Sequence, residues 1–465
     1  MRLVVIGNGM AGARLAAEVR ARDKDIQITV FGAETRRTYN RVLLSNVLAG
    51  TASPEQVRLP AHAEGVTARL GVTVTAIDRA SRTVRTGDGG CEPYDVLVLA
   101  TGSEPVVPPI PGVTRAIAFR TMDDCDRILG VAATASSAVV IGGGLLGVEA
   151  ARGLAGRGMP VTLLHPAGHL MERQLDAEAG LVLGEALAGL GVVVRTGVQV
   201  TAILDHGVEL ATGETLASQL VVLACGVRPV VGLAVDAGLE VARGVVVDDQ
   251  MRTGDPAIYA IGECAQHDGT VYGLVAPAWE QAAVVADLIT GADRTARYRG
   301  SRLVTRLKAR SVELAAMGET HLTEDSAGAV EVVRFTHRAR GIYRKLVIRN
   351  DRLVGAILLG ESPTVGTLTQ LYDRGGPLPG DRTGLLFPGL DGATPADSPV
   401  RMPDAARVCD CNNVTKGHIR ACWEAGARDT AAVVAATRAT TGCGSCRDAV
   451  EGLIGWLCEQ EEVRT

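Results

Sequence analysis

The sequence predicts an α/β protein with two parallel-sheet domains, an α+β third domain and a small helical domain near its C-terminal end. Three observations lead to this fold class. An apolar strand, a glycine-rich turn and a helix follow one another near the N-terminus, and the pattern returns about 135 residues later. Strand-like segments then fill residues 297–386, and four grouped cysteines follow.

The composition is typical of a globular enzyme. The 465 residues are 47% hydrophobic and only 3% aromatic, and 56 of them are glycine. A formal net charge of −5 gives no basic footprint, so we expect no nucleic-acid partner. No apolar run reaches about 18 residues, so we expect no membrane span. The N-terminus has no secretory signal, and we expect a cytoplasmic protein whose ten cysteines serve metal binding or redox chemistry.

The first glycine-rich turn predicts a dinucleotide site. Residues 2–6 are branched and apolar, as in a parallel strand buried on both faces. In the G-x-G-x-x-G turn that follows, one glycine permits the tight turn, one lets the backbone approach a pyrophosphate, and one lets helix and strand pack closely. A second strand, residues 26–31, precedes an acid suited to binding ribose. The predicted contacts of this Rossmann-like domain are Gly7, Gly9, Met10, Ala11, Gly12 and Glu34.

The second turn repeats this pattern. A strand at 137–141 leads into the turn at 142–147, then a helix and a strand that ends at His165. NAD sites usually have an acid at that last position, so the sequence leaves NADH versus NADPH open. Arg173 lies nearby, but not at the place expected for a residue that binds a 2′-phosphate. The predicted contacts are Gly142, Gly144, Leu145, Leu146 and Gly147.

Two more stretches, Y-D-V-L-V-L-A-T-G-S at 94–103 and A-I-Y-A-I-G-E at 257–263, complete a resemblance to the pyridine-nucleotide-disulfide oxidoreductase superfamily. The resemblance implies FAD on the first turn and NAD(P)H on the second. It places the FAD-binding domain at 1–112 and 224–292, and the NAD(P)H-binding domain at 113–223. The further cofactor contacts that it implies are Ala100, Thr101, Gly102, Glu149 beside the nicotinamide, Gly262, Glu263 on the ribityl chain, and Trp279 on a helix aimed at the flavin.

Two of these residues have simpler alternatives. Glu149 could be a solvated helix residue, and Trp279 could belong to the core.

The absence of cysteine between residues 13 and 90 excludes a redox dithiol on the first helix. Cys91, Cys125, Cys225 and Cys264 are read as small buried hydrophobic residues. In place of a dithiol stands Y-N-R-V-L-L-S at 39–45. This segment resembles the flavin half of assimilatory nitrite reductase large subunits, as do 171–176 and 272–277. Asn40 and Arg41 are therefore candidate catalytic residues, together with Glu149, and Arg41 is also a candidate cofactor contact. The alternative for Asn40 and Arg41 is an exposed loop with a salt bridge.

Residues 297–386 read as antiparallel strands and correspond to the third, interface-type domain of the superfamily. Basic residues crowd its beginning, between 294 and 310. They could form a docking face for an acidic redox partner or a solvated face balanced by carboxylates. Residues 387–406 read as a linker, because proline, glycine, aspartate and serine break any periodic pattern.

The four cysteines have the spacing C-x-C-x31-C-x2-C. Two short chelating pairs can hold zinc or an iron–sulfur cluster, and two expected helices separate them. This segment resembles bacterioferritin-associated-ferredoxin-like [2Fe-2S] domains, which implies such a domain at 407–460. Lys416, Arg420 and Arg447 lie close enough in sequence to balance a negative cluster, and Cys422 and Cys458 are read as packing residues. The implied ligands are Cys409, Cys411, Cys443 and Cys446.

Together these features predict a flavoprotein that converts hydride from NADH, or from NADPH, into single electrons. The nitrite reductases that it resembles continue into a sirohaem and [4Fe-4S] domain, whereas this sequence has no further cysteine cluster. We therefore expect an electron-transfer subunit that serves the catalytic subunit of an assimilatory nitrate (or nitrite) reductase. The resemblance to such subunits implies a molybdenum-containing nitrate reductase as the partner. An NAD(P)H-dependent ferredoxin or rubredoxin reductase is the first alternative, and a redox sensor or iron-release module is the second.

Overall fold

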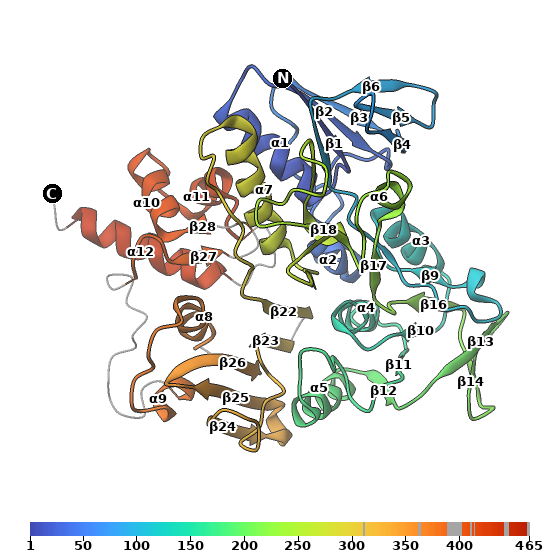
Figure 1. Ribbon diagram of the computed structural model, residues 1–465. Coiled ribbons are helices and arrows are strands. Elements are labelled where there is room, and N and C mark those ends of the chain that lie inside the picture. The colour runs from blue at the N-terminus through green and yellow to red at the C-terminus, as the bar shows by residue number, and fades with distance from the viewer. Residues whose placement is uncertain are drawn as a thin grey trace. The chain divides into compact units, whose positions relative to one another are not determined.

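The computed structural model describes residues 1–309, 312–360, 364–387, 402–409, 412, 414–440 and 446–462 (Figure 1). The chain divides into two compact units. The first contains Met1–Arg41, Pro54–Pro105 and Val227–Ser301, and the second contains Val42–Ser53, Val106–Gly226 and Arg302–Thr465.

A five-stranded parallel sheet in the order β19-β7-β1-β2-β3 forms the centre of the first unit. It contains β1 (Arg2–Ile6), β2 (Gln27–Gly32), β3 (Val66–Leu70), β7 (Val96–Leu99) and β19 (Ile258–Ala260). The middle of β1 is fully buried, as its unbroken apolar sequence predicts. Two helices, α1 (Met10–Arg22) and α7 (Val275–Thr290), pack against each other beside this sheet (Figure 1).

Smaller sheets complete the first unit. The strands β4 (Val74–Asp78), β5 (Thr83–Thr86) and β6 (Cys91–Pro93) are antiparallel, and β18 (Val245–Val247), β20 (Ala265–His267) and β21 (Thr270–Val271) form a second small sheet. A short helix, α6 (Gly232–Asp236), is also present. The ribbon of β8 (Ser103–Pro105) and β17 (Val227–Pro229) lies where the chain leaves the unit and returns, because Pro105 is the register partner of Val227.

The second unit begins with another five-stranded parallel sheet, in the order β12-β11-β10-β16-β9. Its strands are β9 (Ile117–Ala118), β10 (Ala138–Ile141), β11 (Val161–His165), β12 (Val192–Thr196) and β16 (Leu220–Leu223). The helices are α2 (Leu44–Ala49), α3 (Met122–Ala132), α4 (Leu145–Ala155) and α5 (Ala177–Gly189), and the antiparallel strands are β13 (Val200–Leu204), β14 (Gly207–Leu210) and β15 (Thr215–Ala217). Helix α2 packs against α4.

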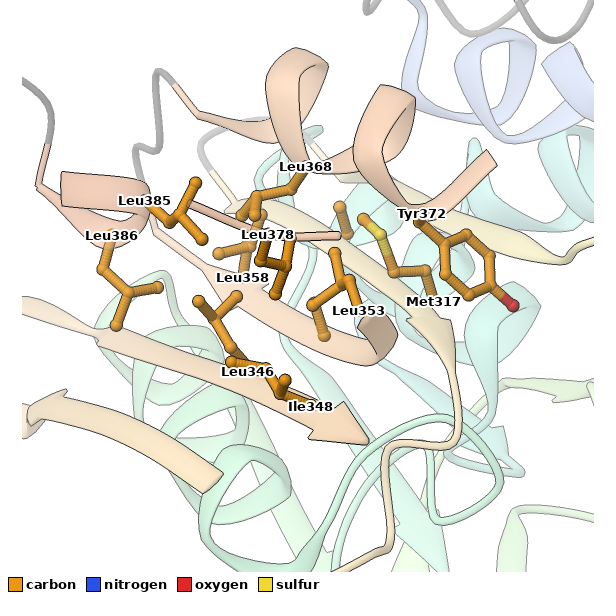
Figure 2. Close-up of a cluster of buried hydrophobic side chains, with 12 residues drawn as sticks. Met317, Leu346, Ile348, Leu353, Leu358, Leu368, Tyr372, Leu378, Leu385 and Leu386 are labelled. Carbon is orange, nitrogen blue, oxygen red and sulfur yellow. The ribbon is translucent and has the colours of Figure 1, made fainter. Parts of the chain in front are cut away.

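The third domain is an antiparallel sheet in the order β22-β23-β26-β25-β24, as the alternating segments predicted. Its strands are β22 (Val304–Ala309), β23 (Val312–Gly318), β24 (Val330–His337), β25 (Ile342–Arg349) and β26 (Arg352–Leu359), followed by α8 (Val365–Arg374) and α9 (Thr383–Leu386). The turn between β25 and β26 consists of Asn350 and Asp351, both with positive φ, which is the two-residue hairpin turn that suits twisted strands. Figure 2 shows the core, where Leu368 and Tyr372 of α8 meet Leu353 and Leu358 of the sheet.

The C-terminal domain is small and helical. It contains a hairpin of β27 (Arg407–Cys409) and β28 (Val414–Thr415), then α10 (Lys416–Glu424), α11 (Thr430–Thr437) and α12 (Arg447–Glu462). The described part of the chain has no helix long and apolar enough to cross a bilayer. The predicted fold class is confirmed, while the domain boundaries and the linker, most of which lies outside the described residues, stay predictions.

Candidate functional site

The first glycine-rich turn has one open and two crowded positions. Gly7 has φ +116°, and a Cβ there would lie 2.1 Å from the carbonyl oxygen of Ala100. A Cβ on Gly12 would lie 1.9 Å from the carbonyl oxygen of Gly7. A Cβ on Gly9 would meet nothing within 4 Å, and Gly9 begins α1 without a capping side chain. The turn therefore exposes backbone and the first N–H groups of a helix, as a site for a pyrophosphate requires.

The turn is braced by two residues that the sequence did not single out. The Nε2 of His62 lies 2.8 Å from Oδ1 of Asn8, and the hydroxyl of Thr38 donates to the carbonyl oxygen of Asn8 at 3.1 Å. Burial lowers the pKa of His62, so its ring is neutral at pH 7 and donates through Nε2. No local motif marks either contact, because His62 lies 54 residues from Asn8.

The predicted ribose acid Glu34 lies beside the segment that carries Asn40 and Arg41. The hydroxyl of Tyr39 donates to Glu34 at 2.7 Å, and Arg41 forms an ion pair with the same carboxylate. The guanidinium of Arg41 also lies over the Tyr39 ring, 5.1 Å from its centroid. Asn40 is only 2% exposed, and its N–H donates to Val57. Arg41 thus makes the salt bridge that the alternative predicted, but Asn40 is not part of an exposed loop.

The carboxylate of Glu263 is fixed at the end of the parallel sheet. The hydroxyl of Ser103 donates to it at 2.5 Å. Its neighbour Gly262 has φ +79° and donates its N–H to Oε1 of Gln281, on α7, at 2.7 Å. The hydroxyl of Thr101 donates to the carbonyl oxygen of Val230 at 2.7 Å. Ala100 and Gly102 flank Thr101. The hydrogen bond between Ser103 and Glu263 joins the two predicted stretches, and Ala100 lies against Gly7 of the first turn.

Trp279 belongs to the buried face of α7. The guanidinium of Arg14, on α1, lies 5.2 Å from the centroid of its ring. Its Nε1 atom is buried, and no described residue accepts a hydrogen bond from it. A buried N–H without an acceptor costs free energy, which fits a polar group of a ligand at this position.

The second glycine-rich turn has the same geometry as the first. Gly142 has φ +112°, and a Cβ there would lie 2.3 Å from the carbonyl oxygen of Ala224. A Cβ on Gly147 would lie 1.7 Å from the carbonyl oxygen of Gly142, whereas one on Gly144 would meet nothing within 4 Å. Gly144 begins α4 without a capping side chain, and Leu145 and Leu146 form its partly exposed first turn.

Glu149 follows on the same helix and is only 4% exposed. This burial rules out the solvated helix residue that the sequence had left as an alternative. A buried carboxylate within one helical turn of an open glycine cradle is a candidate for contact with a bound nucleotide.

Two of the four predicted cluster ligands lie among the described residues, while Cys411 and Cys443 lie outside them. Cys409 and Cys446 belong to one buried cluster. The side-chain amide of Asn412 lies 3.7 Å from Sγ of Cys409, and the N–H of Thr440 lies 3.2 Å from Sγ of Cys446. Thr440 has a left-handed backbone, with φ +66°. N–H groups aimed at sulfur stabilise thiolates, so the donors fit a metal cluster.

The three cations expected to balance the cluster have other partners. Lys416 is buried, donates to the carbonyl oxygen of Met402 at 2.8 Å and lies over the ring of Trp456. Arg420 forms an ion pair with Asp404 at 2.7 Å, and Arg447 lies 3.7 Å from Glu451. Their positive charges are therefore shared with these groups.

The cysteines outside the predicted cluster range from buried to exposed. Burial raises the pKa of Cys125 to about 12 and also raises the pKa values of Cys225 and Cys264, so these thiols stay protonated at pH 7. The prediction was wrong for Cys91, which is exposed on β6, and Cys225 is only partly buried. Cys458 packs against the C-terminal core, as predicted.

The basic residues of the segment 294–310 differ in their surroundings. Arg302 donates to the carbonyl oxygen of Tyr372 and lies over its ring, and Arg306 lies 3.5 Å from the hydroxyl of Thr369. Both therefore contact α8 of their own domain. Arg294, Arg297 and Arg299 are exposed and belong to the first unit, while Arg310 lies outside the described residues.

Sequence comparison matches three parts of the chain to known families. Residues 1–282 match pyridine nucleotide-disulphide oxidoreductases, residues 304–374 match the rubredoxin NAD+ reductase C-terminal domain, and residues 407–456 match the BFD-like [2Fe-2S] binding domain.

Several curated relatives match nearly the whole chain, two of them from one bacterial strain. Nitrite reductase [NAD(P)H] of Bacillus subtilis (strain 168) is 38% identical over 97% of this chain and 57% of the relative. The assimilatory nitrate reductase electron transfer subunit of the same strain is 35% identical over 99% of this chain and 60% of the relative. The chain thus spans little more than half the length of these relatives.

Among solved structures, the reductase of a covalent putidaredoxin reductase–putidaredoxin complex has a TM-score of 0.75 and 27% identity, covering 84% of this chain and 96% of that one. The glycine cradles and the buried cysteines fit the cofactors of the matched families, which are FAD with NAD(P)H and a [2Fe-2S] cluster. The chain belongs to the pyridine nucleotide-disulphide oxidoreductase family, and its C-terminal part matches a BFD-like [2Fe-2S] binding domain.

Proposed function

We propose that this chain is an electron-transfer flavoprotein that oxidises NAD(P)H and delivers single electrons to a partner reductase. The partner is the catalytic subunit of an assimilatory nitrate or nitrite reductase. One observation carries the proposal: a single chain combines two open glycine cradles with a domain whose core buries both Cys409 and Cys446. The first suits nucleotides that donate or accept hydride, and the second suits a carrier of one electron.

The roles of the residues follow from their positions. The turn at 7–12 holds FAD, with Glu34 toward its ribose, Glu263 toward its ribityl chain and Trp279 beside it. The backbone at Gly9 leaves room for the pyrophosphate, and the first N–H groups of α1 offset its charge. The pair of Arg41 and Glu34 orders the segment that carries Asn40.

NAD(P)H is held at the turn formed by residues 142–147. Gly144 leaves room for its pyrophosphate, and Glu149 lies one turn along α4, where it orients the nicotinamide. When bound, FAD supplies the conversion between a two-electron donor and one-electron carriers. The thiols of Cys125, Cys225 and Cys264 take no part, because burial keeps them protonated.

The four grouped cysteines of the C-terminal domain, Cys409, Cys411, Cys443 and Cys446, hold the cluster. Cys409 and Cys446 supply two thiolates from one buried core, and Asn412 and Thr440 donate N–H groups to their sulfurs. These donors favour the more negative, reduced cluster. The apolar residues around the sulfurs exclude water from them.

The choice of partner is supported by the names of two relatives, a nitrite reductase and an electron transfer subunit of assimilatory nitrate reductase. A molybdenum-containing nitrate reductase subunit is the partner that we propose. The test is NADH-driven nitrate reduction by the purified catalytic subunit, with and without this protein. A rate that does not change on its addition would refute the partner.

The electron path itself is tested without any partner. In an anaerobic titration with NADH and then NADPH, flavin bleaching and the EPR signal of a reduced [2Fe-2S] centre should appear together. Bleaching without a cluster signal, with zinc in the metal analysis, would contradict the path.

A second candidate is an NAD(P)H-dependent ferredoxin or rubredoxin reductase. It is favoured by the third domain, whose residues 304–374 match rubredoxin NAD+ reductases. Rapid NADH-dependent reduction of a ferredoxin or rubredoxin, together with no effect on nitrate turnover, would establish this candidate in place of the first.

A further inference from the structure

The NAD(P)H cradle lacks an acid at the position where such sites usually have one. Strand β11 ends at His165, and the acid that accepts hydrogen bonds from the adenosine ribose normally stands there. His165 is 6% exposed, so it lies under the surface of the cradle and presents little of its ring to a ligand. Another residue must therefore supply the carboxylate if the site is to recognise a free ribose.

The hydrogen bonds of His165 identify that residue. The N–H of Gly143, within the glycine-rich turn, donates to Nδ1 of His165 at 3.0 Å. A backbone N–H can only donate, so Nδ1 carries no proton and the neutral ring carries its proton on Nε2. Nε2 lies 2.9 Å from Oε2 of Glu172 and donates to it. His165 thus connects the turn to a carboxylate seven residues further along the chain.

The loop that carries Glu172 is fastened to the same turn. The N–H of Met171 donates to the carbonyl oxygen of Gly143 at 2.9 Å, and the N–H groups of Gln174 and Leu175 donate to the carbonyl oxygen of Met171. Met171 is fully buried and has φ +53°, a backbone that non-glycine residues seldom adopt and that costs about 1 kcal/mol or more. This strained backbone conformation of Met171 places the next residue, Glu172, beside the turn.

The contacts around Gly143 leave no freedom for this arrangement to shift. A Cβ at this position would lie 2.5 Å from Cδ2 of Leu170 and 2.7 Å from Cγ of His165. The imidazole and the loop are therefore packed directly on the backbone of the turn. The side chain of Glu172 remains 36% exposed, and no described residue bonds to its Oε1.

We propose that Glu172 is the residue that selects NADH over NADPH, and that His165 positions it. Its Oε1 accepts hydrogen bonds from the adenosine ribose hydroxyls of NADH, and its negative charge repels the 2′-phosphate of NADPH. The inference rests on the proposed function in one respect, namely that NAD(P)H binds at the turn of residues 142–147. A buried imidazole with an outlying carboxylate thus replaces the single acid of the usual site.

Binding measurements on the full-length holoprotein test this assignment. The dissociation constants of NAD+ and NADP+ are measured by titration calorimetry for the wild type, Glu172→Gln and a control, Glu178→Gln. Glu178 is exposed at the start of α5 and loses the same charge. We expect the wild type to bind NAD+ at least tenfold more tightly than NADP+, and Glu172→Gln to reduce that ratio at least tenfold. The control should leave the ratio unchanged.

Equal affinity for the two nucleotides in the wild type, or an unchanged ratio in Glu172→Gln, would overturn the inference. Reduced NADP+ affinity in Arg173→Gln, with preference for NADP+ in the wild type, would assign the selection to the neighbouring arginine instead. Glu172→Asp keeps the charge but shortens the side chain, so it should weaken NAD+ binding while NADP+ remains disfavoured. If neither NAD+ nor NADP+ binds, and neither NADH nor NADPH bleaches the flavin, the proposed function fails as well, which separates the two failures.

Discussion

Replacing Gly144 with alanine should weaken nucleotide binding without unfolding the protein. The residue has φ −74° and ψ −178°, which any L-amino acid adopts, and no atom lies within 4 Å of the added Cβ. The new methyl group would therefore occupy the open side of the turn. That side is where the backbone must come close to a pyrophosphate.

The expected change in stability is small because two effects offset each other. Replacing glycine with alanine in an allowed conformation stabilises a protein by about 0.4–1 kcal/mol through the unfolded chain. Alanine is a poorer helix N-cap than glycine, and this costs roughly 0.5–1 kcal/mol. The free energy of unfolding should thus change by less than about 0.5 kcal/mol. Affinity for NADH should fall at least tenfold, which is about 1.4 kcal/mol.

Gly147→Ala is the matched comparison from the same turn. Its Cβ would lie 1.7 Å from the carbonyl oxygen of Gly142, so the backbone must move by more than an ångström. Overpacking of this kind costs roughly 1–3 kcal/mol or more. We expect this variant to lose stability, whereas Gly144→Ala keeps it.

Chemical unfolding and the NAD+ dissociation constant, both measured on holoprotein, check the pair. A Gly144→Ala variant that is stable and binds NAD+ as the wild type does would show that the nucleotide does not pass over this residue. A Gly147→Ala variant as stable as the wild type would refute the account of the packing.

Three further predictions concern stability and the cluster. Lys345→Met should lower the free energy of unfolding in urea by about 3 kcal/mol. Lys345 is 1% exposed, and its partner Asp176, 2.9 Å away, would keep a largely buried charge without it. Adding Asp176→Asn should restore most of the loss. Burial alone would raise the pKa of Asp176, but hydrogen bonds from Lys345, Ala179 and Tyr343 lower it, so its contribution is present above pH about 4 and is lost as pH falls through the folded pKa. Unfolding measured from pH 6 to 3 should therefore show a smaller acid loss in the double variant than in the wild type. Cys409→Ser should abolish iron and acid-labile sulfide while flavin content stays at the wild-type level, and unchanged iron would remove Cys409 from the ligand set.

The parts of the fold that were predictable depend on local sequence. The two turns follow from glycine spacing beside apolar strands, because positive φ and close backbone contact restrict Gly7 and Gly142 to glycine. The third sheet follows from alternation, which directly reflects which face of a strand is buried. The prediction that Cys91 is buried was wrong, because the short strand β6 places it on an exposed side that its neighbours in sequence did not reveal.

Contacts between distant segments were not predictable. Lys345 and Asp176 are 169 residues apart, and no pattern in either segment announces the other. The role of Glu172 was also hidden, although the segment 171–176 stood out in the sequence. It depends on the left-handed backbone of Met171 and on the ring orientation of His165, which the chain adopts only once the loop has packed on the turn. Likewise, only the fold could show that Arg302 and Arg306 turn toward α8.

The ribbon of β8 and β17 affects how freely the segment between these two strands can change in length or sequence. The polypeptide leaves the first unit at Pro105 and returns at Val227, residues that are paired across two strands, and the N–H of Val106 donates to the carbonyl oxygen of Gly226. Whatever stands between these points begins and ends at nearly the same place. A longer segment between these points adds little to the cost of folding, because the entropic cost of loop closure grows only with the logarithm of the loop's length. The inserted segment can thus lengthen, shorten or be exchanged for one with another nucleotide preference, and the strands that carry the flavin cradle keep their register.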